Sequence, residues 1–244
     1  MTQISPADQE RSRDGVFEMF DRIAPRYDFL NRVLSGGIDV WWRSQLVSTL
    51  ASHTGQHILD LATGTGDLLV AMAKDRRVDR VLGVDVSAGM IEAGKHKLEP
   101  LSHAGKDVDM VVGDAMKLEE YVGQFDAVTI SFGIRNVVDV DLALRQMRNA
   151  LKPGGKVLIL EFSTPGNPVV APAYNFYRSR VLPKVGGWIS GDKDAYHYLD
   201  ETIATFPSGD AFVSKMRAAG LVRCTARPMT FGVVTLYEGH REDA

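Results

Sequence analysis

The chain has 244 residues, which is enough for one large α/β domain or at most two small ones. A hydrophobic share of 45% indicates a globular protein with a full core, and a net charge of −3 argues against the strongly basic face typical of nucleic-acid binding. The single cysteine, Cys224, cannot form an internal disulfide, so we expect it to be a small core residue in a reducing, cytoplasmic protein.

Helical spacing dominates the N-terminal part of the chain. The first ten residues are polar, and apolar residues then recur at helical spacing over residues 14–53. Pro25 and the pair Gly36-Gly37 divide this region into about three helices, and Asp39 is predicted as the N-cap of the third. No basic segment followed by an apolar core is visible, and no apolar run is long enough to span a bilayer.

Farther along, short β-branched runs alternate with helical stretches, the pattern of a parallel sheet built from βα units. After the fifth strand, the irregular stretch Ser163–Pro207 is expected to carry one or two helices of its own. The elements predict an α/β fold, with five parallel strands and a closing β-hairpin in one Rossmann-like sheet of seven, helices on both faces and an N-terminal helical cap. The predicted helices are Asp67–Asp75, Ala88–Leu98, Asp139–Leu151 and Asp210–Ala219. The predicted strands are Ile58–Leu61, Arg80–Val84, Val108–Val112, Phe125–Ile130, Lys156–Phe162, Val222–Arg227 and Gly232–Glu238.

The segment Asp60–Asp67 lies at the end of the first strand, where doubly wound sheets bind ligands. Gly64 and Gly66 let the backbone approach a ligand closely, although a purely structural turn would use them in the same way. A dinucleotide-binding turn would have a third glycine where Leu69 stands. The two acids of the segment suit a ligand with an ammonium and a sulfonium better than a pyrophosphate. Asp60, Gly64 and Gly66 are therefore candidate contacts of such a ligand.

Acidic residues follow the second and third strands as well. Asp85 ends the second strand, where a carboxylate can accept both ribose hydroxyls, and Asp114 with Ala115 follows the third, where both can bind adenine. Each acid alone is also explained as a helix cap. Together with the first turn they indicate S-adenosylmethionine and methyl transfer. The sequence has no phosphate-loop Gly-Lys-Ser/Thr and no His/Cys cluster, which argues against a nucleoside triphosphate and a metal.

Further sequence motifs are spread over nearly the whole chain. They are Phe20–Asp28, Ile130–Val137, Leu151–Gly155, Glu161–Ser163, Tyr196–Leu199 and Phe206-Pro207. With the Asp60–Asp67 turn, they resemble the C-methyltransferases of menaquinone and ubiquinone biosynthesis. The glycine turn and the Lys-Pro-Gly-Gly turn are shared by many methyltransferases, whereas Ile130–Val137 and Tyr196–Leu199 are more specific to the quinone family.

The resemblance implies the class I methyltransferase fold and carbon methylation of a demethylated prenylquinol, such as the conversion of demethylmenaquinol to menaquinol. It also implies which residues bind S-adenosylmethionine: Thr65, Asp85, Asp114 with Ala115, and Ser131. Thr63 stands where some members have glycine, which leaves the binding threonine in place.

On the acceptor side, Arg135 and Asn136 lie just past the fourth strand and are well placed to stabilise a developing phenolate. A helix-capping pair with a surface arginine is the alternative interpretation, and any lone histidine can be structural. Further candidates for ring contact or proton acceptance are Tyr27, Asp28, His197 and Tyr198.

Because a prenylated acceptor lies in the bilayer, we expect transient contact with the inner face of the membrane. The isoprenoid tail would enter between the N-terminal helices and residues 163–206. Packing between cap and sheet would equally explain the aromatic side chains considered for that rim, which are Trp41, Trp42, Phe176, Tyr177 and Trp188.

The chain is predicted to be a single domain with four parts: a helical cap over 1–54, a cofactor-binding core over 55–162, a substrate-side insertion over 163–207, and a closing helix and hairpin over 208–244. Three alternatives stay open: a benzoquinol rather than the favoured naphthoquinol, another hydrophobic phenol, and a non-catalytic cofactor-binding protein. A nicotinamide oxidoreductase is opposed by Leu69 and the acidic turn. A homo-oligomer also stays open.

Overall fold

The computed structural model describes residues 21, 24, 27–181, 184 and 193–243, without the side chains of 193–197. Most of the first predicted helix, the polar first ten residues and Trp188 lie outside this part of the chain. The strands are β1 (Gln56–Leu61), β2 (Val78–Asp85), β3 (Asp107–Val112), β4 (Phe125–Ser131), β5 (Leu151–Phe162), β6 (Val222–Met229) and β7 (Val234–His240). The longer helices are α2 (Tyr27–Ser35), α3 (Ile38–Ser48), α4 (Asp67–Ala73), α5 (Ala88–His103), α6 (Val140–Ala150), α7 (Val170–Phe176), α9 (Lys193–Thr205) and α10 (Asp210–Ala218). Short helical turns are η2 (Glu119–Tyr121), η3 (Ile134–Asn136), η4 (Tyr177–Val181, a π-helix) and η5 (Thr230–Gly232).

The strands form one seven-stranded sheet with the order β3-β2-β1-β4-β5-β7-β6. Strands β1 to β5 pair in parallel, and β7 pairs antiparallel with both β5 and β6. The predicted sheet is therefore confirmed. Its strand order reverses between β1 and β4, so a crevice for a ligand is expected beyond the carboxyl ends of these two strands.

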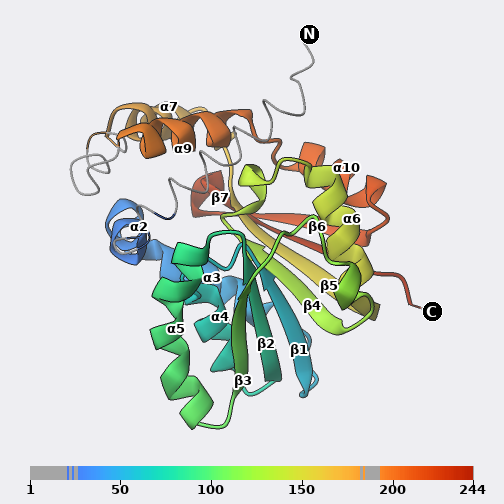
Figure 1. The fold of residues 1–244 in the computed structure, drawn as a ribbon. Coiled ribbons are helices and arrows are strands. Elements are labelled where there is room, and N and C mark those ends of the chain that lie inside the picture. The colour runs from blue at the N-terminus through green and yellow to red at the C-terminus, as the bar shows by residue number, and fades with distance from the viewer. Residues whose placement is uncertain (1–20, 22–23, 25–26, 182–183, 185–192, 244) are drawn as a thin grey trace, which may run out of the picture.

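Helices cover both faces of the sheet, with α3, α4 and α5 on one side and α6 and α10 on the other (Figure 1). A hydrophobic core lies on each face of the sheet, and alternate residues of β1 belong to one core or the other, because successive side chains of a strand point to opposite faces. Leu59 belongs to the core with Leu144 and Phe212, whereas Ile58 belongs to the core with Leu46. The sheet is thus buried on both faces and supports its carboxyl edge rigidly.

Apart from α5, which ends at His103 rather than Leu98, the predicted boundaries hold within two residues, with two informative differences. Strand β5 begins at Leu151 rather than Lys156, because Leu151 already pairs with Phe125 ahead of a register shift. The prediction of Asp39 as an N-cap is wrong: α3 begins at Ile38 behind Gly37, which has φ 80°. The Asp39 carboxylate is instead buried among cationic side chains, which explains why it does not cap the helix.

Helices α7 and α9 lie together at one end of the sheet, above α2 (Figure 1). Helix α9 contacts η3, which follows the carboxyl end of β4, so this layer covers the ligand-binding edge. The expectation that residues 163–207 carry helices of their own is confirmed. Within the described residues no helix has the length and apolar character needed to cross a membrane.

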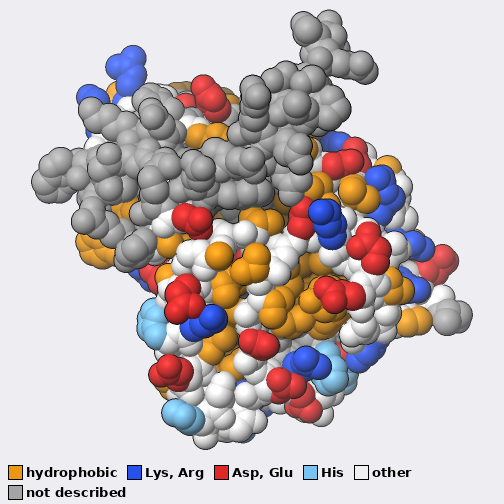
Figure 2. Space-filling view, viewed as in Figure 1, with side chains coloured by type: hydrophobic (Ala, Val, Ile, Leu, Met, Phe, Trp, Pro, Cys, Tyr) orange, Lys and Arg blue, Asp and Glu red, His pale blue; other side chains and the backbone are white. Residues whose placement is uncertain are grey.

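The face of the molecule seen in Figure 2 carries hydrophobic side chains near its centre, and acidic and basic side chains are interspersed around them. This mixture of both charge signs agrees with the small net charge of the whole chain.

Candidate active site

The turn after β1 is held in shape by the acid at the end of β2. Gly64 and Gly66 have φ of 57° and 81°, a left-handed conformation that favours glycine. The Gly64 N–H donates to Asp85 Oδ2 over 2.8 Å, and the Ser87 N–H donates to Asp85 Oδ1 over 2.9 Å. Burial raises the pKa of the Asp85 carboxyl from its ordinary value, although these backbone hydrogen bonds oppose the rise. Asp85 thus joins the first turn to the second strand at the crevice.

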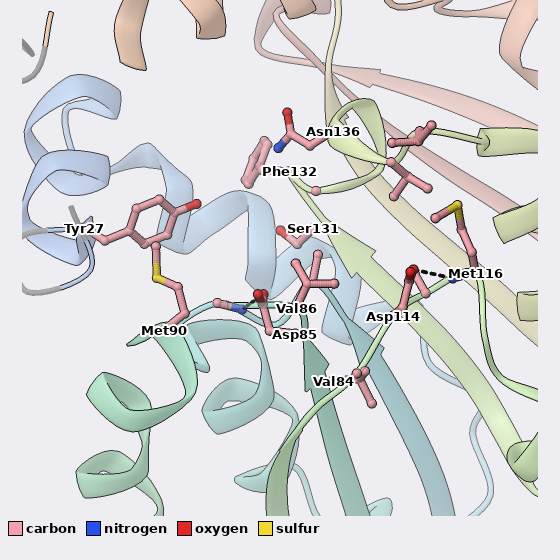
Figure 3. A pocket seen from close by; sticks show the side chains of 17 residues that line it. Tyr27, Val84, Asp85, Val86, Met90, Asp114, Met116, Ser131, Phe132 and Asn136 are labelled. Carbon is pink, nitrogen blue, oxygen red and sulfur yellow. Dashed lines mark hydrogen bonds between the residues drawn. The ribbon is translucent and has the colours of Figure 1, made fainter. Parts of the chain in front are cut away.

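A first cavity opens at this edge and encloses about 760 Å³ of space, its mouth included. In Figure 3 the Tyr27 ring faces Ser131 from the opposite side, with Asp85 below Ser131 and Asp114 farther along the same crevice. Asp114 Oδ1 accepts from the Met116 N–H over 2.9 Å. Five of the residues predicted to bind the cofactor line this cavity, namely Gly64, Asp85, Asp114, Ala115 and Ser131.

The lining suits a nucleoside with a cationic tail. Among the described residues, Ser131 Oγ and Asn136 Oδ1 are buried without a hydrogen-bond partner, so both are free to bind a ligand. A Cβ on Gly133 would stand well within 3.0 Å of the Ala62 side chain, so glycine is required at this wall of the cavity. The Asp85 carboxylate and these two unpaired oxygens can accept hydrogen bonds from hydroxyl and ammonium groups of a ligand.

Three other predicted contacts do not line the cavity: Asp60, Thr65 and Gly66. Asp60 accepts hydrogen bonds from Thr63 Oγ1 (2.7 Å) and Thr129 Oγ1 (2.6 Å), and burial raises its pKa to about 6. Thr65 Oγ1 donates to Asp28 and accepts from Lys97 Nζ at 3.1 Å. In this structure the hydrogen bonds of Asp60 and Thr65 stabilise the turn after β1, and neither side chain lines the first cavity.

A second cavity adjoins the first and encloses about 1670 Å³, its mouth included. It lies between the cap helices α2 and α3, the helices α7 and α9, and the sheet edge, and Tyr27 and Phe132 wall both cavities. Its inner wall is aromatic, since the Phe132 and Phe162 ring centroids are 4.5 Å apart and Trp42 lies 5.9 Å from Phe132. A flat ring could therefore pack here next to the first cavity.

Arg135 lines the second cavity while its neighbour Asn136 lines the first. The Arg135 guanidinium donates to Glu161 Oε1 over 2.7 Å and to the Phe132 carbonyl, and the Glu161 side chain is fully buried. This is a buried ion pair, so the alternative of a surface arginine is wrong. The guanidinium also lies 5.5 Å from the centre of the Phe162 ring.

Four tyrosines are among the other polar residues that line the second cavity: Tyr27, Tyr174, Tyr177 and Tyr198. Burial raises the pKa of Tyr27, while a hydrogen bond with Asn31 and the charges of Arg135 and Arg43 oppose the rise. Burial raises the pKa of Tyr174 to about 12, so its phenol stays protonated at neutral pH. Tyr198 also lines the cavity, whereas the side chain of His197, on α9, lies outside the described residues.

Sequence reasoning missed two charged residues of this cavity, Asp39 and Arg43, both on α3. Asp39 accepts from Arg43 and from Arg32 of α2, and it also accepts from the Ser35 hydroxyl over 2.9 Å. Burial alone would raise the pKa of Asp39, but the two arginines outweigh it and lower that pKa. The four-residue spacing of Asp39 and Arg43, which suits an ion pair on a helix, was the available signal.

The model of the ubiE/COQ5 methyltransferase family matches residues 7–241 of the chain. The chain belongs to this family. It is 44% identical over 225 residues to a ubiquinone/menaquinone biosynthesis C-methyltransferase, UbiE, of Geotalea daltonii, covering 92% of this chain and 95% of that one. It is 40% identical over 238 residues to a demethylmenaquinone methyltransferase of Mycolicibacterium paratuberculosis, covering 98% and 99%. The protein is therefore an S-adenosylmethionine-dependent methyltransferase.

Solved structures agree on the fold. Phosphoethanolamine N-methyltransferase 2 of Haemonchus contortus, solved with S-adenosyl-L-methionine, has a TM-score of 0.60 at 17% identity, covering 88% of this chain and 60% of that one. The [4+2]-cyclase SpnF has a TM-score of 0.61 at 15% identity, covering 94% and 96%. Because a cyclase shares the fold, the acceptor must be argued from the second cavity rather than from the sheet.

Proposed function

We propose that this enzyme methylates a ring carbon of a demethylated prenylnaphthoquinol, converting demethylmenaquinol to menaquinol. The observation that supports the proposal most directly is the second cavity, whose aromatic wall and Arg135 adjoin the cofactor cavity at Tyr27 and Phe132. The names of the relatives from Geotalea daltonii and Mycolicibacterium paratuberculosis point to the same class of acceptor.

In the proposed reaction the residues of the second cavity orient the ring and stabilise its oxygen. Gly64, Asp85, Asp114, Ala115 and Ser131 would hold S-adenosylmethionine, which would supply a methyl group already activated by a positive sulfur. Stacking on Phe132 and Phe162 would hold the ring next to the first cavity, where the reacting atoms are brought into line. Arg135 would stabilise the hydroxyl oxygen as its proton passes to water, which raises the electron density of the adjacent ring carbon. That carbon would bond to the methyl group as the carbon–sulfur bond breaks, and loss of its hydrogen to water as a proton would restore the aromatic ring.

Product analysis tests the proposal. The purified enzyme, with S-adenosylmethionine and a short-chain demethylmenaquinol under reducing conditions, is expected to give the C-methylated naphthoquinol by mass spectrometry. A strain lacking the gene is expected to accumulate the demethylated naphthoquinone. Turnover of an unrelated phenol with no turnover of the naphthoquinol would contradict the proposal.

A benzoquinol is the second candidate acceptor, because the name of the Geotalea daltonii relative covers ubiquinone as well as menaquinone biosynthesis. The same deletion strain separates the two, since loss of benzoquinol methylation would leave a demethylated benzoquinone instead.

We also propose that the prenyl tail leaves the second cavity toward a membrane surface at its mouth. Large hydrophobic side chains lie exposed beside the lining residues: Trp41, next to Trp42, is 49% exposed and Phe176, next to Tyr177, is 63% exposed. Exposed aromatic side chains of this kind favour the interfacial region of a bilayer. The domain division into cap, core, insertion and closing hairpin is retained as part of this proposal, with cap and insertion forming the tail entrance.

A further inference from the structure

Arg43 is a buried cation of the second cavity to which the proposed chemistry gives no role. It lies in the middle of α3, its side chain is 10% exposed, and it lines the cavity. Its Nη1 donates to Asp39 and stands 3.9 Å from Asp67 Oδ2. Within the part of the chain that the structure describes, its Nε and Nη2 make no hydrogen bond. These two nitrogens can therefore donate to a ligand bound in the cavity that Arg43 lines.

Arg43 and Arg135 stand at the same aromatic wall. The Arg43 guanidinium lies 5.8 Å from the centre of the Phe132 ring, and that of Arg135 lies 5.5 Å from the centre of the Phe162 ring. These two rings contact each other, and the charges of both arginines act on the Tyr27 phenol. A ring packed on this wall would lie beside two guanidiniums, one of which could bind each of its two oxygens.

A hydroquinol has two oxygens at opposite ends of its ring, and this creates a problem of orientation. The carbon to be methylated is adjacent to one oxygen, and the carbon that carries the prenyl chain is adjacent to the other. If the enzyme bound only one oxygen, either oxygen of the quinol could occupy that single site. In one of the two resulting orientations, the prenyl-bearing carbon would face the methyl group instead of the carbon to be methylated. Two separate cationic contacts, combined with the direction of the tail, would fix a single orientation.

We infer that Arg43 binds the acceptor oxygen next to the prenyl-bearing carbon, opposite the oxygen at Arg135, and so positions the ring. This inference rests on the proposed quinol acceptor. Asp39 holds the Arg43 guanidinium toward the cavity, while Arg32 helps to hold Asp39 from outside. Arg32 is the natural control, because it shares Asp39 and Asp67 with Arg43 yet does not line the second cavity.

The test uses two acceptors that differ in one oxygen: a short-chain prenyl-1,4-dihydroxynaphthalene and its analogue without the hydroxyl next to the prenyl-bearing carbon. Their dissociation constants are measured under reducing conditions on enzyme loaded with S-adenosylhomocysteine, so that no turnover occurs. Arg43→Met is expected to weaken binding of the dihydroxy acceptor by about tenfold or more and of the analogue by less than about threefold, since a hydrogen bond to a charged group is lost only in the first case. Arg32→Met is expected to change both constants by the same factor.

Equal weakening of both acceptors by Arg43→Met would overturn the inference, because it would reduce Arg43 to a structural partner of Asp39. If Arg43→Met does not fold, the double variant Asp39→Asn/Arg43→Met removes both partners of the ion pair, and the same selective loss for the dihydroxy acceptor is expected. If wild-type enzyme methylates the dihydroxy acceptor but the variants lose affinity for both acceptors equally, the inference about Arg43 is wrong and the proposed function stands. Wild-type enzyme that binds neither acceptor would sink the proposed function with it.

Discussion

At the scale of single residues, the Arg135–Glu161 pair limits how the role of Arg135 can be tested. The Glu161 side chain is fully buried and its partner Arg135 is 7% exposed. Removing one partner of such a pair leaves an uncompensated buried charge, whereas replacing both is often tolerated. A loss of activity in Arg135→Ala would therefore combine lost catalysis with lost stability.

We predict that Arg135→Ala lowers the free energy of unfolding by about 3–5 kcal/mol. The double variant Arg135→Met/Glu161→Gln is expected to recover most of that stability and still lose turnover by at least about tenfold, which corresponds to about 1.4 kcal/mol of activation free energy. Chemical denaturation and kcat measurements check the two parts, and titration with S-adenosylhomocysteine should show unchanged affinity in the double variant. Near-normal turnover in that variant would remove Arg135 from the chemistry.

At the scale of elements, the crevice depends on how closely the turn after β1 approaches the turn after β4. Ala62 and Gly133 stand on these two turns, and a Cβ at position 133 would overlap the Ala62 side chain. The φ of Gly133 is −118°, which any residue can adopt, so the constraint is space rather than backbone conformation.

We predict that Gly133→Ala lowers the free energy of unfolding by about 1–3 kcal/mol through overpacking and weakens S-adenosylhomocysteine binding by pushing the two turns apart. The matched control is Gly166→Ala, because a Cβ there meets no atom within 4 Å. Thermal unfolding and calorimetric titration measure both effects. Equal behaviour of the two variants would show that the close approach is not required.

Much of this element-scale arrangement could be predicted from the sequence. The strands and the acid Asp85 carry local signals, because alternation and strand ends are read directly from residue order. The placement of Thr65 behind the turn and of Asp39 between two arginines could not be predicted in this way. The place of Thr65 depends on a contact between distant segments, Asp28 of α2 with Thr65, which no local pattern encodes. The partners of Asp39 are close in sequence, but their spacing does not indicate that the group is buried at a cavity. Arg43 was missed for the same reason, since one arginine on an amphipathic helix is usually solvent-facing.

At the scale of the whole molecule, the two cavities are lined by residues from different parts of the chain. The first is lined by residues between Tyr27 and Val138, whereas the second draws its walls from α2 and α3 near one end of the chain and from α9 and Val233 near the other. The acceptor site therefore forms only when the two ends of the chain come together beside the sheet.

Two exposed aromatic side chains, Trp41 and Phe176, are sequence neighbours of residues that line the second cavity, and they lead to a prediction about the intact protein. Wild-type enzyme is expected to float with liposomes that contain a prenylquinol, and Trp41→Gln/Phe176→Gln is expected to float several-fold less, because both side chains lose favourable burial in the interface. The control is Val122→Gln, since Val122 is 56% exposed but precedes β4 at the opposite edge of the sheet. Equal flotation of both variants and wild type would argue against a membrane surface at the mouth.

The common wall of Tyr27 and Phe132 also has a consequence for inhibition. An adenosine-like group in the first cavity and an aromatic ring in the second would be close enough for a short covalent linker past these two side chains. Such a bisubstrate ligand would lose its translational and rotational freedom once instead of twice, so its affinity would exceed that of either half by a large factor. Selectivity over other methyltransferases would come from the ring half, because the fold that binds the adenosine half is widely shared.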